Sequence, residues 1–523
     1  MRMLVGVATV LTALAGVSYP ESTTKNLYEV STENGRLRGV PNSYRSVVAF
    51  KGVPFAARPS GEFRWKPPRR AENWTGIWPA DKFGPACLQT EVFGDLRVRG
   101  EPPGEDCLSL NIWVPKRVRE TKLPVIVWLY GGGFVTGDSS ESRYDGENLA
   151  KKGVIVVIPN YRLGVFGFFA HPDLTKESPI KTSGNYGLLD QVAALQWVSR
   201  NIASFGGDPQ NVTLAGQSAG SFSVSVLMTS PLARGLFQKA IGESGGFYPP
   251  LTPLADAEKV GKEFVKSLGA SSIPEMLNKP AAELLRAAAK FKGGFGFDSI
   301  LDGYVLPTDP ITVYSQGKQL HIPLLAGWNA DEGKMSFLSA PQKTTAKSFA
   351  QLARSRFGVY DAEFLKLYPA DSDERAMHSA EELADDDFSG FSTWEWVEMH
   401  RKTGNSPLYE YHFEQVPAVR SGESVGSKHS DEIEYVFQTL NSRGGVLWTA
   451  KDYELSDTVS TYWVNFAKFG NPNLQGLPNW PQYTSADGFQ VMHLVGSDIH
   501  ASPDMARSRL TFLESHSLKP TTP

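Results

Sequence analysis

Runs of consecutive apolar residues, separated by stretches with helical spacing, dominate the chain after residue 108. The runs at 125–130 and 154–158 are almost wholly apolar, as strands buried on both faces of a sheet must be. Residues 188–200 follow with apolar positions at the spacing of one helix face. Further strands are predicted at 108–114, 212–215, 239–242, 323–327 and 408–413. This alternation predicts an α/β protein with a mostly parallel central sheet.

The N-terminal part shows shorter β-forming stretches between turn signals. They cover residues 28–32, 36–40 and 46–51, and they predict antiparallel strands at the entry to the sheet. Helical spacing recurs in three later segments, expected as cap insertions, at 254–286, 348–357 and 383–402. Residues 502–523 are predicted to form a helix and a frayed tail. No repeat or linker divides the chain, so one α/β domain is expected over residues 19–523.

The first 18 residues have the pattern of a secretory signal peptide. A short basic start, Met1-Arg2-Met3, precedes a run of apolar, small and Thr residues from 4 to 15, with Ala13-Leu14-Ala15 as a cleavage site. The run is too short to span a bilayer. We therefore expect cleavage between Ala15 and Ser18, and a secreted or periplasmic protein without stable membrane insertion. The alternative is a disordered or buried apolar N-terminus.

Composition narrows the possible partners. The 523 residues include 52 Lys and Arg against 56 Asp and Glu, a net charge of −4, so no basic field predicts nucleic-acid binding. The two cysteines, Cys87 and Cys107, predict one disulfide if the protein is exported. Two unpaired buried thiols are the alternative in a reducing compartment.

A nucleophile motif follows the apolar run 212–215. Gly216-Gln217-Ser218-Ala219-Gly220 fits G-x-S-x-G, and the small, apolar residues 221–228 after it are expected to form a buried helix. In that strand–turn–helix context the motif indicates a nucleophile elbow, whose sharp turn exposes the serine hydroxyl. Alone, the pattern is short enough to arise by chance.

A serine nucleophile needs a base and an orienting acid. His429 lies in a loop after the strand 408–413, which is predicted to be the last parallel strand. Loops at the carboxyl ends of strands form the site in open α/β sheets. For the acid, Glu332 and Asp331 both follow the strand 323–327, and spacing does not separate them. The chain order serine, acid, histidine is that of α/β-hydrolases.

Donors for the oxyanion are predicted after the strand 125–130. Gly131-Gly132-Gly133-Phe134 lets backbone N–H groups approach a substrate oxygen, together with the N–H of Ala219. The alternative is a flexible turn. A Walker phosphate loop is excluded because no Gly-Lys-Ser/Thr follows.

Several stretches together resemble the type-B carboxylesterases, the family that includes cholinesterases. They include the elbow, the triple glycine and the motifs Glu105-Asp106-Cys107-Leu108, Asn160-Tyr161-Arg162-Leu163-Gly164 and Phe205-Gly206-Gly207-Asp208-Pro209. The match extends through Asp331-Glu332-Gly333 and His429 to Gly470-Asn471-Pro472-Asn473, in order along almost the whole mature chain.

The resemblance implies an α/β-hydrolase fold and a serine carboxylesterase acting on small-molecule esters. It assigns Ser218 as nucleophile, His429 as base and Glu332, in preference to Asp331, as acid. It assigns Gly132, Gly133 and Ala219 as oxyanion donors, a disulfide to Cys87 and Cys107, and an ion pair to Arg64 and Glu105. It gives Ser244 and Gln217 supporting positions. Such a mechanism needs neither a cofactor nor a metal ion, and none is expected.

Departures from the family pattern bear on the substrate. Cholinesterases carry Glu where this chain has Gln217, and a Trp in the loop closed by the cysteines, where this chain has none. Both differences argue against choline esters, whose cation such a Trp would bind. The glycines of 292–297, in the acyl-pocket region, favour a roomier pocket. The charged loop 88–106 is a poor lipase lid.

Two other classes of function are compatible with these residues. The triad is equally able to hydrolyse an amide, a lactone or a bulky aromatic ester. A non-catalytic adhesion or binding module of the same fold is a further alternative, and a generic ester separates it from an enzyme.

Overall fold

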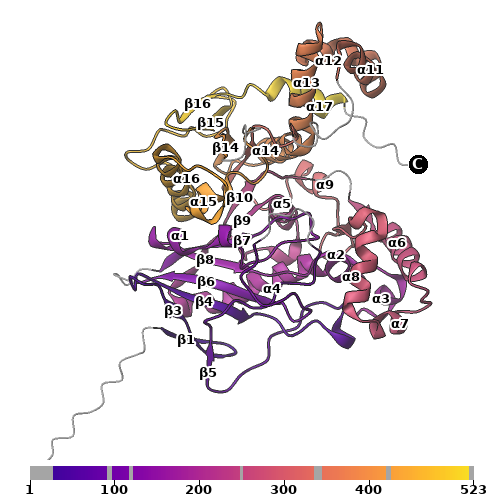
Figure 1. Cartoon of the computed structure of the whole chain (residues 1–523), viewed down its shortest axis with the longest axis vertical. Coiled ribbons are helices and arrows are strands. Elements are labelled where there is room, and N and C mark those ends of the chain that lie inside the picture. Colours follow the sequence, from indigo (N-terminus) through magenta and orange to yellow (C-terminus); the bar gives the residue numbers. More distant parts are fainter. Residues whose placement is uncertain are drawn as a thin grey trace, which may run out of the picture.

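The computed structural model of the chain is built around a sheet of eleven strands (Figure 1). It describes residues 28–90, 97–116, 122–247, 251–334, 344–419 and 426–516. The strand order is β16 (His500–Pro503), β15 (Gln490–Leu494), β14 (Leu408–Phe413), β13 (Leu324–Asn329), β10 (Lys239–Glu243), β9 (Gly207–Gln217), β7 (Leu123–Leu129), β8 (Ile155–Pro159), β6 (Ser109–Pro115), β4 (Val47–Pro54) and β3 (Val40–Pro41). The strands from β15 to β8 are parallel to their neighbours, and the pairs at both edges are antiparallel. The predicted α/β class with a mostly parallel sheet is confirmed.

The N-terminal strands depart from the prediction. β1 (Glu29–Thr32) and β2 (Gly35–Arg38) pair in a separate small sheet with β5 (Ile77–Pro79), and only β3 and β4 enter the main sheet. A second small sheet joins β11 (Thr252–Pro253) to β12 (Ile300–Leu301). The strand 408–413 is also not the last parallel one, because β15 lies beyond it.

Helices cover both faces of the main sheet. They are α1 (Glu147–Lys151), α2 (Gly164–Phe168), α3 (Pro172–Glu177), α4 (Tyr186–Asn201), α5 (Ala219–Leu227), α6 (Leu254–Ser267), α7 (Ile273–Asn278), α8 (Ala281–Lys290), α9 (Pro310–Ser315), α11 (Ala346–Phe357), α12 (Asp361–Leu367), α13 (Asp373–Asp385), α14 (Phe391–Thr403), α15 (Ile433–Phe437), α16 (Ala450–Phe469) and α17 (Arg507–His516). None of these helices is long and apolar enough to cross a membrane in the part of the chain that the structure describes.

Two consecutive residues of β10 contact helices on opposite faces of the sheet. A Cβ on Gly242 would lie 2.2 Å from the Trp396 ring in α14 and 2.7 Å from the Ser221 hydroxyl in α5. Glu243, the next residue, accepts a hydrogen bond of 2.6 Å from the Trp463 ring of α16. Because successive side chains of a strand point to opposite faces, α5 and α14 lie on one face and α16 on the other.

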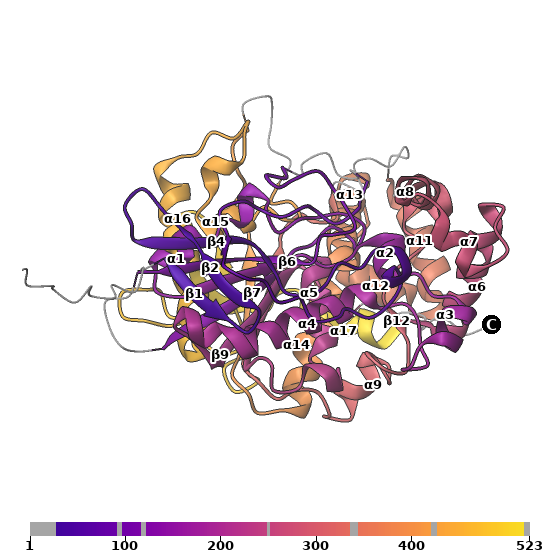
Figure 2. The same ribbon diagram turned by 90° about the horizontal axis from the view of Figure 1, so that it is seen from below.

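The predicted helical insertions are present. α6, α7 and α8 lie beside α3 at one end of the molecule in both views (Figures 1 and 2), between β10 and β13 in the chain. α11 to α14 follow β13, with a π-helical turn, η7 (Asp386–Gly390), between α13 and α14. At the C-terminal end α17 is the helix predicted within residues 502–523, and residues 517–523 of that segment lie outside the described residues.

The two cysteines are bonded as predicted. Cys87 and Cys107 form a disulfide, and each residue is 1% exposed. The predicted ion pair lies close by in sequence, with Arg64 Nε 2.7 Å from Glu105 Oε1. The disulfide closes a loop of 20 residues. Because it restricts the unfolded chain, it stabilises the folded protein by about 3 kcal/mol.

Removal of both cysteines is therefore expected to lower stability. The double variant Cys87→Ser, Cys107→Ser should unfold at a temperature several degrees lower, with turnover at 25 °C retained. Scanning calorimetry with and without reductant measures this, and the double variant itself serves as the control that reductant must not affect. Equal unfolding temperatures of wild type and variant would contradict the stabilising role.

Candidate active site

Ser218 lies in a sharp turn between β9 and α5, as the G-x-S-x-G motif predicts. Its φ of 55° and ψ of −125° are unusual for a residue with a side chain. Its N–H donates to the carbonyl of Glu243 at 2.8 Å, which fixes the turn against β10. Ser218 is partly exposed while Gln217 and Ala219 beside it are buried. The turn therefore presents a serine at the carboxyl end of a central strand.

The glycines of the motif are required by close backbone contacts. A Cβ on Gly216 would lie 2.5 Å from the carbonyl carbon of Gly220. A Cβ on Gly220 would lie 1.9 Å from the carbonyl oxygen of Leu129 on β7. No side chain fits at either distance, so both positions need glycine for the turn to close.

The triple glycine after β7 lies against the same turn. A Cβ on Gly131 would lie 2.9 Å from the Cβ of Ser218. Gly132 and Gly133 have φ values of 108° and 60°, a region that glycine adopts readily. Within the described residues, the N–H groups of Gly132 and Gly133 donate no hydrogen bond to the protein. Ala219, the first residue of α5, also has no intrahelical partner for its N–H.

His429 and Glu332 are in contact, although they are 97 residues apart. His429 Nδ1 lies 3.0 Å from Glu332 Oε2. The Glu332 side chain is fully buried, and the His429 side chain is 24% exposed. Glu332 follows β13 and His429 follows β14, two adjacent parallel strands, so their loops meet at one edge of the sheet.

Three further groups hold the Glu332 carboxylate. The hydroxyls of Ser244 and Ser389 donate to its two oxygens, and the N–H of Asn329 donates to Oε1 at 2.9 Å. Burial opposes ionisation of Glu332, but His429 and these hydroxyls outweigh it and lower the pKa below its usual value. Glu332 is therefore an ionised carboxylate at neutral pH.

Asp331, the competing acid, has other partners. Its Oδ2 accepts the N–H of Ser427 at 2.8 Å, and its Oδ1 lies 3.3 Å from the Lys334 ammonium. It thus joins the loop after β13 to the loop that carries His429.

The other ring nitrogen of His429 contacts the elbow. His429 Nε2 lies 3.2 Å from Gln217 Nε2, and in the described residues it has no hydrogen bond to Ser218. If the Gln217 amide donates to Nε2, the ring proton lies on Nδ1 and faces Glu332. That tautomer leaves a lone pair on Nε2, the nitrogen that faces Gln217 of the elbow, as a general base requires.

Two further carboxyl groups near the site, those of Glu243 and Glu432, are fully buried. Burial raises the pKa of Glu243 to about 8, although the Trp463 ring N–H bonds it. Burial and the nearby charge of Glu243 raise the pKa of Glu432 well above its usual value, although Asn329 donates to its side chain. Burial therefore favours the protonated form of both Glu243 and Glu432.

The pKa of His429 reflects these neighbours. Burial alone would lower it, but the charge and hydrogen bond of Glu332 outweigh burial, and Glu432 and Asp431 add to the effect. The pKa of His429 is raised above its usual value.

Residues Phe388 and Ser389, which the sequence did not single out, complete the surroundings. Both lie in the π-helical turn η7, where Ser389 bonds Glu332 and the Phe388 ring packs edge-on against His429 with centroids 5.0 Å apart. Isolated π-helical turns are frequent at functional sites, but nothing in the sequence marks one here. Phe295, in the predicted acyl-pocket region, lies beside the triple glycine: a Cβ on Gly133 would be 3.3 Å from its ring.

Known proteins are similar to the chain over most of its length. A sequence model of the carboxylesterase family matches residues 26–500. The chain is 38% identical over 462 residues to a fumonisin B1 esterase of Sphingopyxis macrogoltabida, which covers 86% of this chain and 84% of that protein. It is 37% identical over 497 residues to a medium-chain fatty acyl-CoA hydrolase precursor of Anas platyrhynchos, and this alignment covers 87% of this chain and 86% of that protein.

Solved structures agree with these relatives. A PNB esterase superposes with a TM-score of 0.78 and 32% identity, covering 93% of this chain and all of that one. The predicted α/β-hydrolase fold is confirmed.

Proposed function

The chain belongs to the carboxylesterase family and is a carboxylic ester hydrolase, and we propose that it works through a Ser218–His429–Glu332 triad and an acyl-enzyme. The contact between His429 and Glu332, with His429 also against Gln217 of the elbow, is the observation that carries this proposal. It joins an acid and a base from distant parts of the chain beside the turn of the motif, as a triad requires.

The reaction follows from the tautomer of His429. Nε2 accepts the hydroxyl proton of Ser218 as Oγ attacks the ester carbonyl. The imidazolium that forms is stabilised by the ionised Glu332. His429 then protonates the alcohol, whose C–O bond breaks, and an acyl group remains on Ser218. Water attacks this acyl group by the same route and regenerates the serine.

The charge on the substrate oxygen is proposed to rest on the N–H groups of Gly132, Gly133 and Ala219. Support comes from the close approach of Gly131 to Ser218 and from the free N–H groups on both segments. Each such donor contributes about 3–4 kcal/mol to stabilisation of the transition state.

Gln217 is proposed to support the base rather than to react. Its amide contacts the nitrogen of His429 that must accept the proton. The contact keeps the imidazole ring oriented until a bound substrate orders Ser218 against Nε2. Hydrogen bonds of this kind often tighten only in the substrate complex.

A panel of acyl compounds tests the function and the substrate class. The relatives act, by their names, on fumonisin B1 and on fatty acyl-CoA, so the panel should include p-nitrophenyl esters of increasing acyl length, a thioester and an anilide. We expect turnover of the esters, and no preference for a choline ester over a neutral ester with the same acyl group. A marked preference for the choline ester would contradict our interpretation of Gln217, and turnover of none would favour a binding module.

Acidification is expected to lower kcat/KM. Only neutral His429 accepts a proton, and a raised pKa keeps the cation present to higher pH. The acid limb of the profile should therefore have its midpoint above about 6.5, the ordinary histidine value. A rate that stays flat from about pH 5 to 8 would exclude His429 as the base.

We also propose that the protein is exported as one hydrolase domain of residues 19–523. The signal-peptide pattern of residues 1–18 lies outside the described residues, and the Cys87–Cys107 disulfide supports an oxidising compartment. Edman sequencing of protein recovered from outside the cytoplasm should begin between residues 16 and 19.

A further inference from the structure

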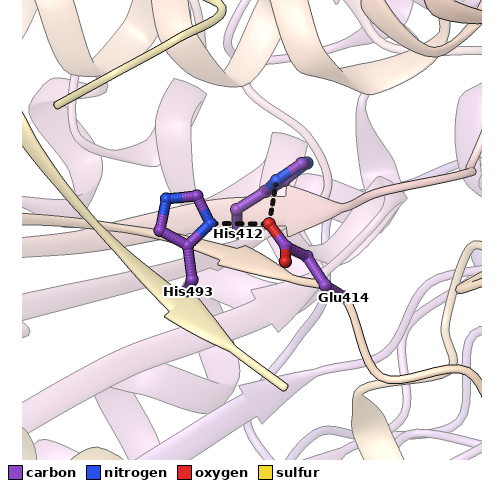
Figure 3. Close-up of side chains that lie close together, drawn as sticks. All are labelled: His412, Glu414 and His493. Carbon is purple, nitrogen blue, oxygen red and sulfur yellow. Dashed lines mark hydrogen bonds and ion pairs between the residues drawn. The ribbon is translucent and has the colours of Figure 1, made fainter. Parts of the chain in front are cut away.

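Three polar side chains gather on one face of the sheet, outside the active-site contacts described above (Figure 3). His412 lies in β14, and Glu414 follows two residues later, so both side chains point to the same face. His493 in β15 is the register partner of His412. His412, Glu414 and His493 are here called the His–Glu–His cluster.

The cluster converges on one carboxylate oxygen. Glu414 Oε1 lies 3.1 Å from His412 Nδ1 and 2.6 Å from His493 Nδ1 (Figure 3). Two ring nitrogens and one carboxylate oxygen therefore face a common point.

The other ring nitrogen of His493 also has a hydrogen-bond partner. Its Nε2 lies 2.8 Å from the hydroxyl of Ser502 on the neighbouring strand β16. Histidines that ligate a metal usually bond their other nitrogen to such a group, which fixes the ring and the tautomer. A hydroxyl is able to donate to Nε2 or to accept from it, so Ser502 suits His493 both with and without a metal on Nδ1.

We propose that the His–Glu–His cluster binds a divalent transition-metal ion of the zinc type. Around a tetrahedral zinc with bonds of about 2.0–2.1 Å, ligand atoms lie about 3.3 Å apart. The ligand atoms here all lie within 4.8 Å of one another, so modest shifts of the side chains admit the ion. Imidazole ligands favour zinc, copper or nickel over magnesium and calcium, which prefer oxygen.

The three side chains leave room for a further ligand. They are 28%, 31% and 17% exposed for His412, Glu414 and His493, so water reaches the ion as a fourth ligand. The ion would link β14 to β15. Because the serine mechanism uses no metal, the ion is expected to stabilise the C-terminal strands without taking part in ester hydrolysis.

Zinc titration of the full chain tests this site. After dialysis against EDTA and removal of the chelator, calorimetric titration with Zn²⁺ should show one site per chain. The variants His493→Gln and Glu414→Gln should each bind at least about tenfold more weakly. Zn²⁺ should raise the unfolding temperature of the wild type by a few degrees, with the rise lost in both variants.

His378→Gln is the matched control. It also removes a histidine near a glutamate, since His378 Nε2 lies 4.0 Å from Glu382, but far from the cluster in sequence and on an exposed part of α13. Binding to this variant should be unchanged. Unfolding temperatures without metal and turnover of an ester show that each variant is folded. Absence of stoichiometric binding, or equal affinity of wild type and the two cluster variants, would overturn the proposal.

Discussion

Replacing Ser218 by alanine should reduce kcat for a p-nitrophenyl ester by about 10⁵–10⁶-fold. The hydroxyl oxygen is the only atom removed, and alanine keeps the Cβ that the turn already accommodates at φ 55°. The backbone bond from residue 218 to Glu243 remains as well. The loss is therefore expected in the chemical step, with an unchanged unfolding temperature. The small rate that remains should come from substrate binding and the oxyanion donors.

Ser223→Ala provides the comparison within the same helix. The Ser223 hydroxyl bonds the carbonyl of Ala219 at 2.9 Å and the Gln191 amide at 3.0 Å, so its loss perturbs α5 without touching the reacting atoms. This variant should retain turnover within about tenfold. Similar kcat values for Ser218→Ala and wild type would remove Ser218 from the mechanism.

Glu332→Gln is the second large effect, with an expected fall in kcat of about 10³–10⁴-fold. The amide has the size of the carboxylate, but its charge is lost and it is able to donate to Nδ1. His429 is then free to adopt the wrong tautomer, and the imidazolium loses its counter-charge. The pKa of His429 should fall as well, because Glu332 is the main group that raises it. Steady-state kinetics and a histidine NMR titration measure the two effects.

Asp331→Asn distinguishes this role from a general effect of negative charge. Asp331 is adjacent in sequence, but it bonds Ser427 and Lys334 rather than His429. Its variant should lose less than about tenfold in kcat. Equal losses in both variants would argue against Glu332 as the specific partner of the base.

Much of the fold could be predicted because buried parallel strands are uniformly apolar. β7, β8, β10, β13 and β14 were all expected within a few residues of their observed bounds. The twenty-residue helix α16 was not expected, although Leu455, Val459 and Trp463 recur every fourth residue. Its β-branched and aromatic side chains have low helix propensity, and tertiary packing outweighs that preference. β16 was missed because it is a short edge strand that ends in proline.

Most residues of the candidate site, and their order along the chain, could be predicted from the sequence, but the contacts between their side chains could not. Motif and strand ends indicated Ser218 and His429, whereas spacing left Glu332 and Asp331 equivalent and the family resemblance separated them. The bonds from Ser389 and Asn329 to Glu332 depend on how η7 and β13 pack, which no local pattern encodes. The contact of Gln217 with His429 was likewise visible only after folding.

Identification of the acylated residue tests the central claim most directly. A rapid acid quench of the enzyme with a p-nitrophenyl ester, followed by peptide mass spectrometry, locates any trapped acyl group. We predict one acyl group per chain, on Ser218, forming with the burst of p-nitrophenol and then decaying to the steady-state level. An acyl group on another residue, or full turnover with none trapped at any time, would contradict the account.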